Sequence, residues 1–161
     1  MDLVQRARDL YSAGRMHDAF EAAQAACDRA PKDPEAWWLL ARITRHIGLT
    51  AASDEAFRRA AALTPGRPQP YRVSVERFVT LLQDVRDTLS PDGQERLYGK
   101  ALQVLPLPSA EEVRHGLDPD ALIARKRAPN PQVTIFQVNH ENRSHSEAAL
   151  RALLKRSLSR A

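Results

Sequence analysis

The sequence predicts a mainly α-helical first part, built from paired helices and a further helix, followed by a small α+β module. In the first part, small residues and chain-breaking residues recur at a constant interval, which is typical of stacked helical hairpins. After Pro91, short β-branched stretches alternate with proline-rich and helical stretches, which indicates a mixed module. We therefore divide the chain into residues 1–67, 68–90 and 91–161.

Composition limits the possible functions. The 161 residues include one cysteine, Cys27, so an internal disulfide and a four-thiolate metal site are both excluded, and a packing role is expected for this thiol. The first residues carry frequent charges and lack a long apolar run, so we expect no membrane segment and a cytoplasmic location. The formal charge of +4 comes mainly from arginines and lysines in the last third.

An internal repeat organises the first part of the chain. Each proposed repeat position recurs 34 residues later, in the pairs Ala7 and Ala41, Gly14 and Gly48, Ala26 and Ala60, and Pro31 and Pro65. The alanines allow two helices to pack closely. The glycines can end the first helix of each pair in a left-handed conformation, and the prolines end the second helix. The sequence therefore predicts two helix–turn–helix units.

These positions resemble the tetratricopeptide repeat family over residues 2–67. The second copy matches the family better than the first, which has Leu3 where a tryptophan is usual. The family positions of the second copy are Trp37, Leu40, Ala41, Gly48, Phe57, Ala60 and Pro65. The resemblance implies that the first helices of the two hairpins line a groove that holds a peptide or a helix of another protein.

The positions that the resemblance assigns to this groove are basic and aromatic: Arg8, Tyr11, Trp38, Arg42, Arg45 and His46. Guanidinium groups beside aromatic rings favour a partner that carries carboxylates, through charge-assisted hydrogen bonds and stacking. In the competing interpretation, Trp38 packs under the next helix and the arginines are only solvated.

A further helix is expected to cover the open edge of the hairpins. Ser74 is the expected N-cap, and apolar residues from Val75 to Leu89 then recur at helical spacing. Tyr71 stands 34 residues after Trp37, as the start of a third repeat would. We expect this helix to cap the repeats.

The last part reads as a mixture of strands and a helix. Residues 103–107 and Val133–Val138 are expected to be strands, joined by a polar, turn-rich connection. Ser144 and Glu147 form a possible capping box for a final helix whose leucines recur on one side, namely Leu150, Leu153, Leu154 and Leu158. If exposed, this leucine face could pair with a second copy of the chain.

Three stretches, residues 107–113, 116–122 and 131–139, resemble the minimal zincin-like metallopeptidase domain that follows such repeats in some bacteria. The resemblance extends over residues 71–161. Activity in that family depends on an H-E-x-x-H helix, in which two histidines hold zinc and the glutamate activates water. This motif is absent from the sequence. We therefore expect a non-catalytic adaptor without a cofactor, in which a pseudoenzyme module adds a second interaction surface.

Two alternatives compete with the adaptor. His140 and His145 flank a stretch similar to the zinc motif and could serve a weak or altered zinc enzyme, but an interval of five residues puts them on different helix faces. Nucleic acid could bind the basic residues of the last third, which include Lys126, Arg127, Arg151, Lys155, Arg156 and Arg160. Aromatic residues do not interleave these cations as a base-stacking platform would need, since only Phe136 lies between the first and the last of them, so this alternative is disfavoured.

Overall fold

The computed structural model describes residues 2–161 and divides into two compact units. Unit 1 contains the residues up to Gln69 together with Pro108–Pro119. Unit 2 contains Pro70–Leu107 and Asp120–Ala161. Helices predominate in the described chain, and a small mixed sheet accompanies them in unit 2, so the predicted fold class is confirmed.

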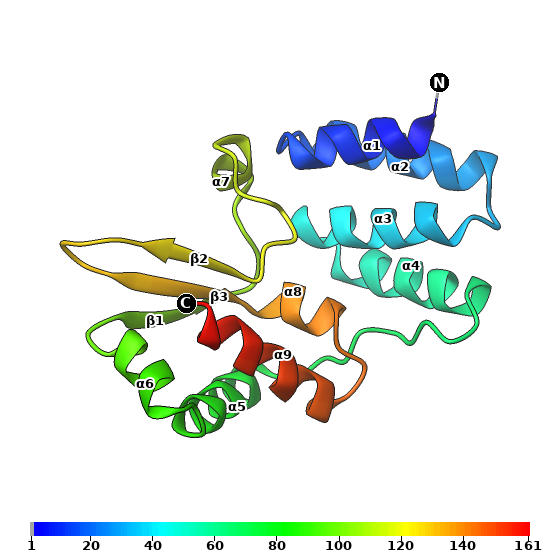
Figure 1. The fold of residues 1–161 in the computed structure, drawn as a ribbon. Helices are drawn as coiled ribbons and strands as arrows, with labels where there is room; N and C mark the ends of the chain where they lie inside the picture. The colour runs from blue at the N-terminus through cyan, green and yellow to red at the C-terminus, as the bar shows by residue number, and fades with distance from the viewer. Residues whose placement is uncertain (1) are drawn as a thin grey trace. The chain divides into compact units, whose positions relative to one another are not determined.

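Unit 1 is built on consecutive helical hairpins (Figure 1). The first hairpin consists of α1 (Leu3–Ser12) and α2 (Met16–Arg29), and the second of α3 (Pro34–His46) and α4 (Thr50–Leu63). Asp2 and Asp33 cap α1 and α3 by accepting hydrogen bonds from backbone N–H groups of the first turn. Pro34 occupies the first turn of α3, where its missing N–H costs nothing.

The repeated residues take the positions that the sequence predicts. Ala7 and Ala41 are fully buried, as close packing of the helices requires. Gly14 and Gly48 follow α1 and α3 with φ angles of +78° and +81°, a region that residues with a Cβ atom avoid. The buried Ala26 and Ala60 lie on α2 and α4, and Pro31 and Pro65 follow the ends of these helices. The predicted helical hairpins are confirmed.

Unit 1 also contains a short helix, α7 (Ala110–Arg114), from the segment that was expected to be a turn-rich connection. A capping box starts it. The Ser109 hydroxyl accepts a hydrogen bond from the Glu112 N–H at 3.1 Å, and the Glu112 carboxylate accepts one from the Ser109 N–H at 3.0 Å. The connection is therefore partly helical.

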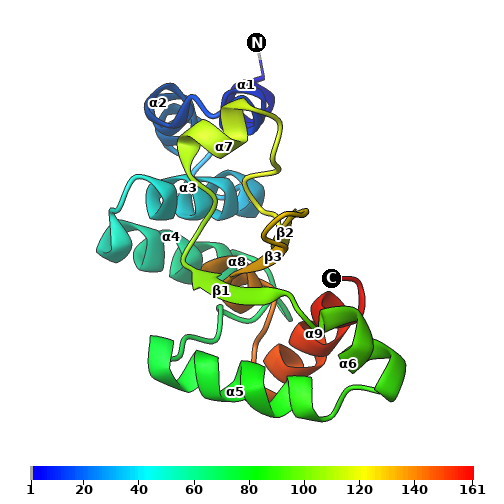
Figure 2. The ribbon, with the colours of Figure 1, turned by 90° about the vertical axis from the view of Figure 1, so that its left-hand side faces the viewer.

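Unit 2 contains a three-stranded sheet in the order β1-β3-β2. β1 (Ala101–Leu105) is parallel to β3 (Gln132–Phe136), whereas β2 (Ile123–Lys126) is antiparallel to it. Helices α5 (Val75–Asp87), α6 (Pro91–Leu97) and α9 (Glu147–Ser159) lie on one side of this sheet, and α8 (Gln137–Asn142) follows β3 directly (Figures 1 and 2).

The helix predicted to cap the repeats has its apolar face inside unit 2. Phe78 and Leu81 of α5 are fully buried in one cluster with Ile135 of the sheet and Leu150 of α9. Tyr71 also packs against this cluster and lies in an extended segment, so it does not start a third-repeat helix. The expectation that this apolar face covers the repeats was therefore wrong, because the face packs against the sheet and α9.

Three boundary predictions in the last part need correction. The first strand runs over Ala101–Leu105, where residues 103–107 were expected. The chain leaves the sheet after Phe136 and continues as α8, where a strand was expected to run to Val138. Ser146, and not Ser144, caps α9, because its hydroxyl accepts a hydrogen bond from the Ala149 N–H at 3.1 Å. The Ser144 hydroxyl instead donates to the His140 carbonyl at 2.8 Å.

The leucine face of α9 is buried and does not form an exposed edge. Its leucines are at most 8% exposed and pack within unit 2, namely Leu150, Leu153, Leu154 and Leu158. The expectation that this face is available to a second copy was therefore wrong. Within residues 2–161, every helix is too short or too polar to span a lipid bilayer.

Candidate functional site: the face formed by α1 and α3

The first helices of the two hairpins, α1 and α3, form the face to which the sequence assigns the partner site. We call it the α1/α3 face. The structure brings three of the predicted residues together there. The ring of Tyr11 meets the imidazole of His46 edge to face with centroids 5.3 Å apart, and the Arg42 Cζ lies 5.6 Å from the Tyr11 centroid. The predicted aromatic and basic groups thus form one cluster.

A second group of side chains lies nearer the start of α3. Trp38 packs edge-on against Phe57 of α4, with ring centroids 4.9 Å apart. The guanidinium carbon of Arg67 lies 4.7 Å from the centroid of Trp38, within the distance of a cation–π contact. Trp38 therefore packs on α4 and stays half-buried.

Two arginines share one carboxylate at this end of the face. Arg67 Nη1 lies 2.9 Å from one Glu35 oxygen, and Arg8 Nη2 lies 3.7 Å from the other. The side chain of Arg8 remains 43% exposed, so this guanidinium can still bind an external group. Sequence reasoning predicted Arg8 but missed Glu35 and Arg67. Glu35 is an acidic residue of the first helical turn, and Arg67 follows the second hairpin, so neither carried a recognisable signal.

The segment 108–119 covers the other end of the face, near the ends of α1 and α3. Val113 is 1% exposed and belongs to the same apolar cluster as Ala7 and Tyr11. The Nε2 of His46 lies 3.1 Å from the Pro119 carbonyl oxygen. Because a carbonyl only accepts, His46 is the donor and carries a proton on Nε2.

This contact changes the predicted partner site. Tyr11 is only 3% exposed, and His46 already has a hydrogen-bond partner in the chain. We therefore restrict the candidate site to Arg8, Trp38, Arg42 and Arg45, all of them half-buried residues of α1 and α3, with Arg67 beside them.

A matched pair of glycines tests whether α7 lies against α1. A Cβ at Gly14 would stand 2.8 Å from the Ala110 carbonyl oxygen and 2.7 Å from the Arg114 Cγ, whereas one at Gly48 would meet nothing within 4 Å. Both glycines have positive φ, so both alanine substitutions carry the same backbone strain of about 1 kcal/mol.

We expect Gly14→Ala to lower the free energy of unfolding by about 1–2 kcal/mol more than Gly48→Ala, because only Gly14 has backbone atoms of α7 against it. Urea unfolding of the two variants measures the difference. Equal losses would show that α7 does not occupy this position in solution.

The cysteine and the two histidines of the zinc-like stretch lie elsewhere. Cys27 is 2% exposed, and burial, followed by the nearby Asp28 and Asp33, raises the pKa of its thiol to about 12. The thiol therefore stays protonated and serves as a packing group.

His140 is fully buried in unit 2, and both of its ring nitrogens have partners. Nδ1 lies 2.8 Å from the Phe136 carbonyl oxygen and must donate to it, so Nε2 accepts from the Ser157 hydroxyl at 2.8 Å. Burial, with a smaller effect of Arg143, lowers the pKa of His140 to about 4. Among residues 2–161, no three metal-ligating side chains of the His, Cys, Asp and Glu types gather at one point.

Comparison with known proteins agrees with the geometry of unit 1. A tetratricopeptide repeat family model matches residues 2–43, which contain α1, α2 and most of α3. No curated protein and no solved structure gave a significant match to the chain. The matched residues include Arg8, Trp38 and Arg42 of the candidate site, and tetratricopeptide repeats typically bind other proteins.

Proposed function

We propose that the chain is a non-catalytic adaptor that holds an acidic peptide or helix of another protein on its α1/α3 face. The observation that carries the proposal is the open end of that face, where Arg8, Arg67 and Trp38 surround a single carboxylate, Glu35. An incoming carboxylate could replace Glu35 as the partner of Arg8, because this pair is long at 3.7 Å and largely exposed.

A segment of the chain itself, residues 108–119, supports the proposal that the α1/α3 face binds a peptide or a helix. Residues 108–119 lie on the other end through Val113 and Pro119, and this segment carries three acidic residues, Glu111, Glu112 and Asp118, and one arginine, Arg114. An acidic stretch with one short helix thus already rests on the face. In this proposal the external partner binds beside this segment, on the part of the face near the start of α3.

We further propose that residues 91–161 are a degenerate metallopeptidase-like module that adds a second interaction surface. The hydrogen bonds of His140 support the absence of a family-type zinc site here, since both nitrogens that could bind a metal are used inside unit 2. Zinc titration by calorimetry tests this part of the proposal. Stoichiometric binding that disappears in His140→Ala with His145→Ala would contradict it.

Selection from a displayed peptide library tests the main proposal. We expect peptides rich in Asp and Glu to be enriched, and we expect Arg42→Glu with Arg45→Glu to weaken their binding by at least about a hundredfold, because two attractions become repulsions. The Arg42→Gln with Arg45→Gln pair should give a smaller loss in the same direction.

The matched control reverses two exposed arginines on α2 and α4, through Arg29→Glu with Arg58→Glu. This control changes the net charge equally and should keep binding within about twofold once long-range attraction is screened by physiological salt. Circular dichroism establishes that each variant is folded. Selected peptides without excess acidic residues would contradict the proposal. So would an equal loss of peptide affinity in the Arg42/Arg45 variant and in the Arg29/Arg58 control.

A further inference from the structure

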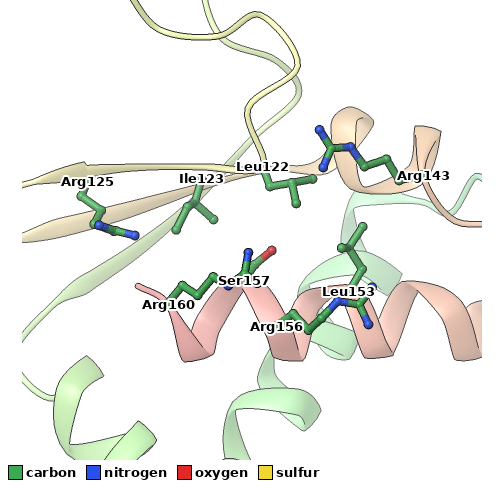
Figure 3. A pocket seen from close by; sticks show the side chains of 8 residues that line it. All are labelled: Leu122, Ile123, Arg125, Arg143, Leu153, Arg156, Ser157 and Arg160. Atoms are coloured by element: carbon green, nitrogen blue, oxygen red, sulfur yellow. The ribbon is translucent and has the colours of Figure 1, made fainter.

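Unit 2 contains a half-open pocket of about 550 Å³ between β2, the end of α8 and α9. Figure 3 shows its side chains, with the strand residues on one side and the α9 residues on the other. The apolar part consists of Leu122, Ile123 and Leu153. The polar part consists of Ser157 and the arginines Arg125, Arg143, Arg156 and Arg160.

The sheet geometry places one of these arginines on the helix-covered face. Ile123 pairs with Ile135, and Arg125 pairs with Val133, so the two β2 residues alternate onto the side of the sheet that carries the apolar core. Arg125 consequently lines the pocket together with Ile123 (Figure 3). A guanidinium is thus directed onto the face where an aliphatic side chain would be usual.

The pocket carries positive charge without a carboxylate among its lining residues. Within residues 2–161, Arg125, Arg156 and Arg160 have no acidic partner within 4.0 Å. The neighbouring Arg151 behaves differently, because its guanidinium lies 3.5 Å from both Asp84 and Glu147. Helix α9 therefore uses one arginine for an internal ion pair and directs two others to the pocket.

Ser157 adds no charge to this pocket. Its hydroxyl donates to the Nε2 of the neutral His140 at 2.8 Å, so it offers only lone pairs to the pocket. The guanidinium groups of β2, α8 and α9 thus determine the chemistry of the space. Four such groups around a single volume favour an anion with several oxygen atoms, which planar guanidiniums bind in a bidentate manner.

We propose that this pocket binds the phosphate ester of a small organic molecule. The phosphate lies between the guanidiniums of α9 and Arg125, and the organic part packs on Leu122, Ile123 and Leu153. The volume of about 550 Å³ lies within the usual size of small-molecule sites, about 300–1,000 Å³, which combine apolar lining with a few converging polar groups.

NMR titration of the chain with phenyl phosphate and with inorganic phosphate tests the proposal at fixed salt. We expect both to shift the Arg side-chain and Ser157 signals, and we expect phenyl phosphate to bind at least about threefold more tightly, since its ring reaches apolar surface. Arg156→Gln with Arg160→Gln should weaken phenyl phosphate binding at least about tenfold, because charge-assisted hydrogen bonds are lost. Arg125→Gln should weaken it in the same direction from the opposite wall.

Arg96→Gln is the matched control, because Arg96 is an exposed arginine of α6 in the same unit and does not line the pocket. It should leave affinity unchanged within about twofold, as expected for a screened distant charge. No shift up to saturating phenyl phosphate, or an equal loss in Arg96→Gln, would overturn the proposal. So would tight binding of a single-stranded oligonucleotide with no response to phenyl phosphate, which would indicate a site for nucleic-acid backbone.

Discussion

Glu141→Ala is expected to lower the free energy of unfolding by about 3 kcal/mol, because it removes the buried carboxylate of an ion pair whose arginine, Arg72, is 27% exposed. The Glu141 side chain is 2% exposed, and one carboxylate oxygen lies 3.2 Å from Arg72 Nη1. The other oxygen accepts hydrogen bonds from the Val73 N–H at 2.9 Å and from Gln137 Nε2 at 3.2 Å. This single carboxylate therefore joins the segment before α5 to α8.

Glu147→Ala is the matched control for this prediction. Glu147 pairs with Arg77 and Arg151, but these side chains are 35%, 46% and 40% exposed, so removal of both pairs should cost at most about 1 kcal/mol. Urea unfolding at neutral pH measures both variants. Similar losses in the two variants would show that burial adds nothing to the Arg72–Glu141 pair in solution.

Acid is expected to destabilise the chain through His140. The usual pKa of 6.5 applies to the unfolded chain, and burial lowers the folded value to about 4. Between these values the unfolded state binds more protons than the folded state, so stability falls as the pH falls. The loss begins near pH 6.5, ends near pH 4 and amounts to about 3 kcal/mol for this one group.

His140→Asn separates this effect from the titration of carboxylates in the same range. The asparagine amide can still donate to the Phe136 carbonyl, but it cannot be protonated. The variant should be less stable than the original chain at pH 7, and the difference should shrink by about 3 kcal/mol by pH 4. Parallel stability curves over this range would mean that His140 is not buried as a neutral ring.

Local signals in the sequence were sufficient for the hairpins and for α5. Gly14 and Gly48 act through backbone conformation, and the alanines act through close packing of helices that follow one another in the sequence. The starts of α5 and α9 show the limit of such signals. Ser74 caps α5 as predicted, whereas Ser146 replaces Ser144 as the cap of α9, because Ser144 is used by α8.

The missed elements lack a local signal or depend on distant contacts. β2 is four residues long, and its sequence, Ile-Ala-Arg-Lys, has no apolar alternation. α7 shows only a capping box, and its place on the α1/α3 face depends on Val113 meeting residues about a hundred positions earlier. Glu35 and Arg67 of the candidate site were missed for the same reason. Glu35 pairs with Arg8 of another helix, and Arg67 contacts Trp38 from outside the helices.

The two tryptophans allow the most direct test of the α1/α3 face, because the sequence contains only Trp37 and Trp38. The Trp37 indole N–H donates to the Pro31 carbonyl at 2.8 Å and lies outside the proposed site, whereas Trp38 lies beside Arg67 within it. In an NMR titration with an acidic peptide from the library, the account predicts a large shift of the Trp38 indole signal and little change for Trp37. A bound peptide that leaves Trp38 unchanged would contradict the account.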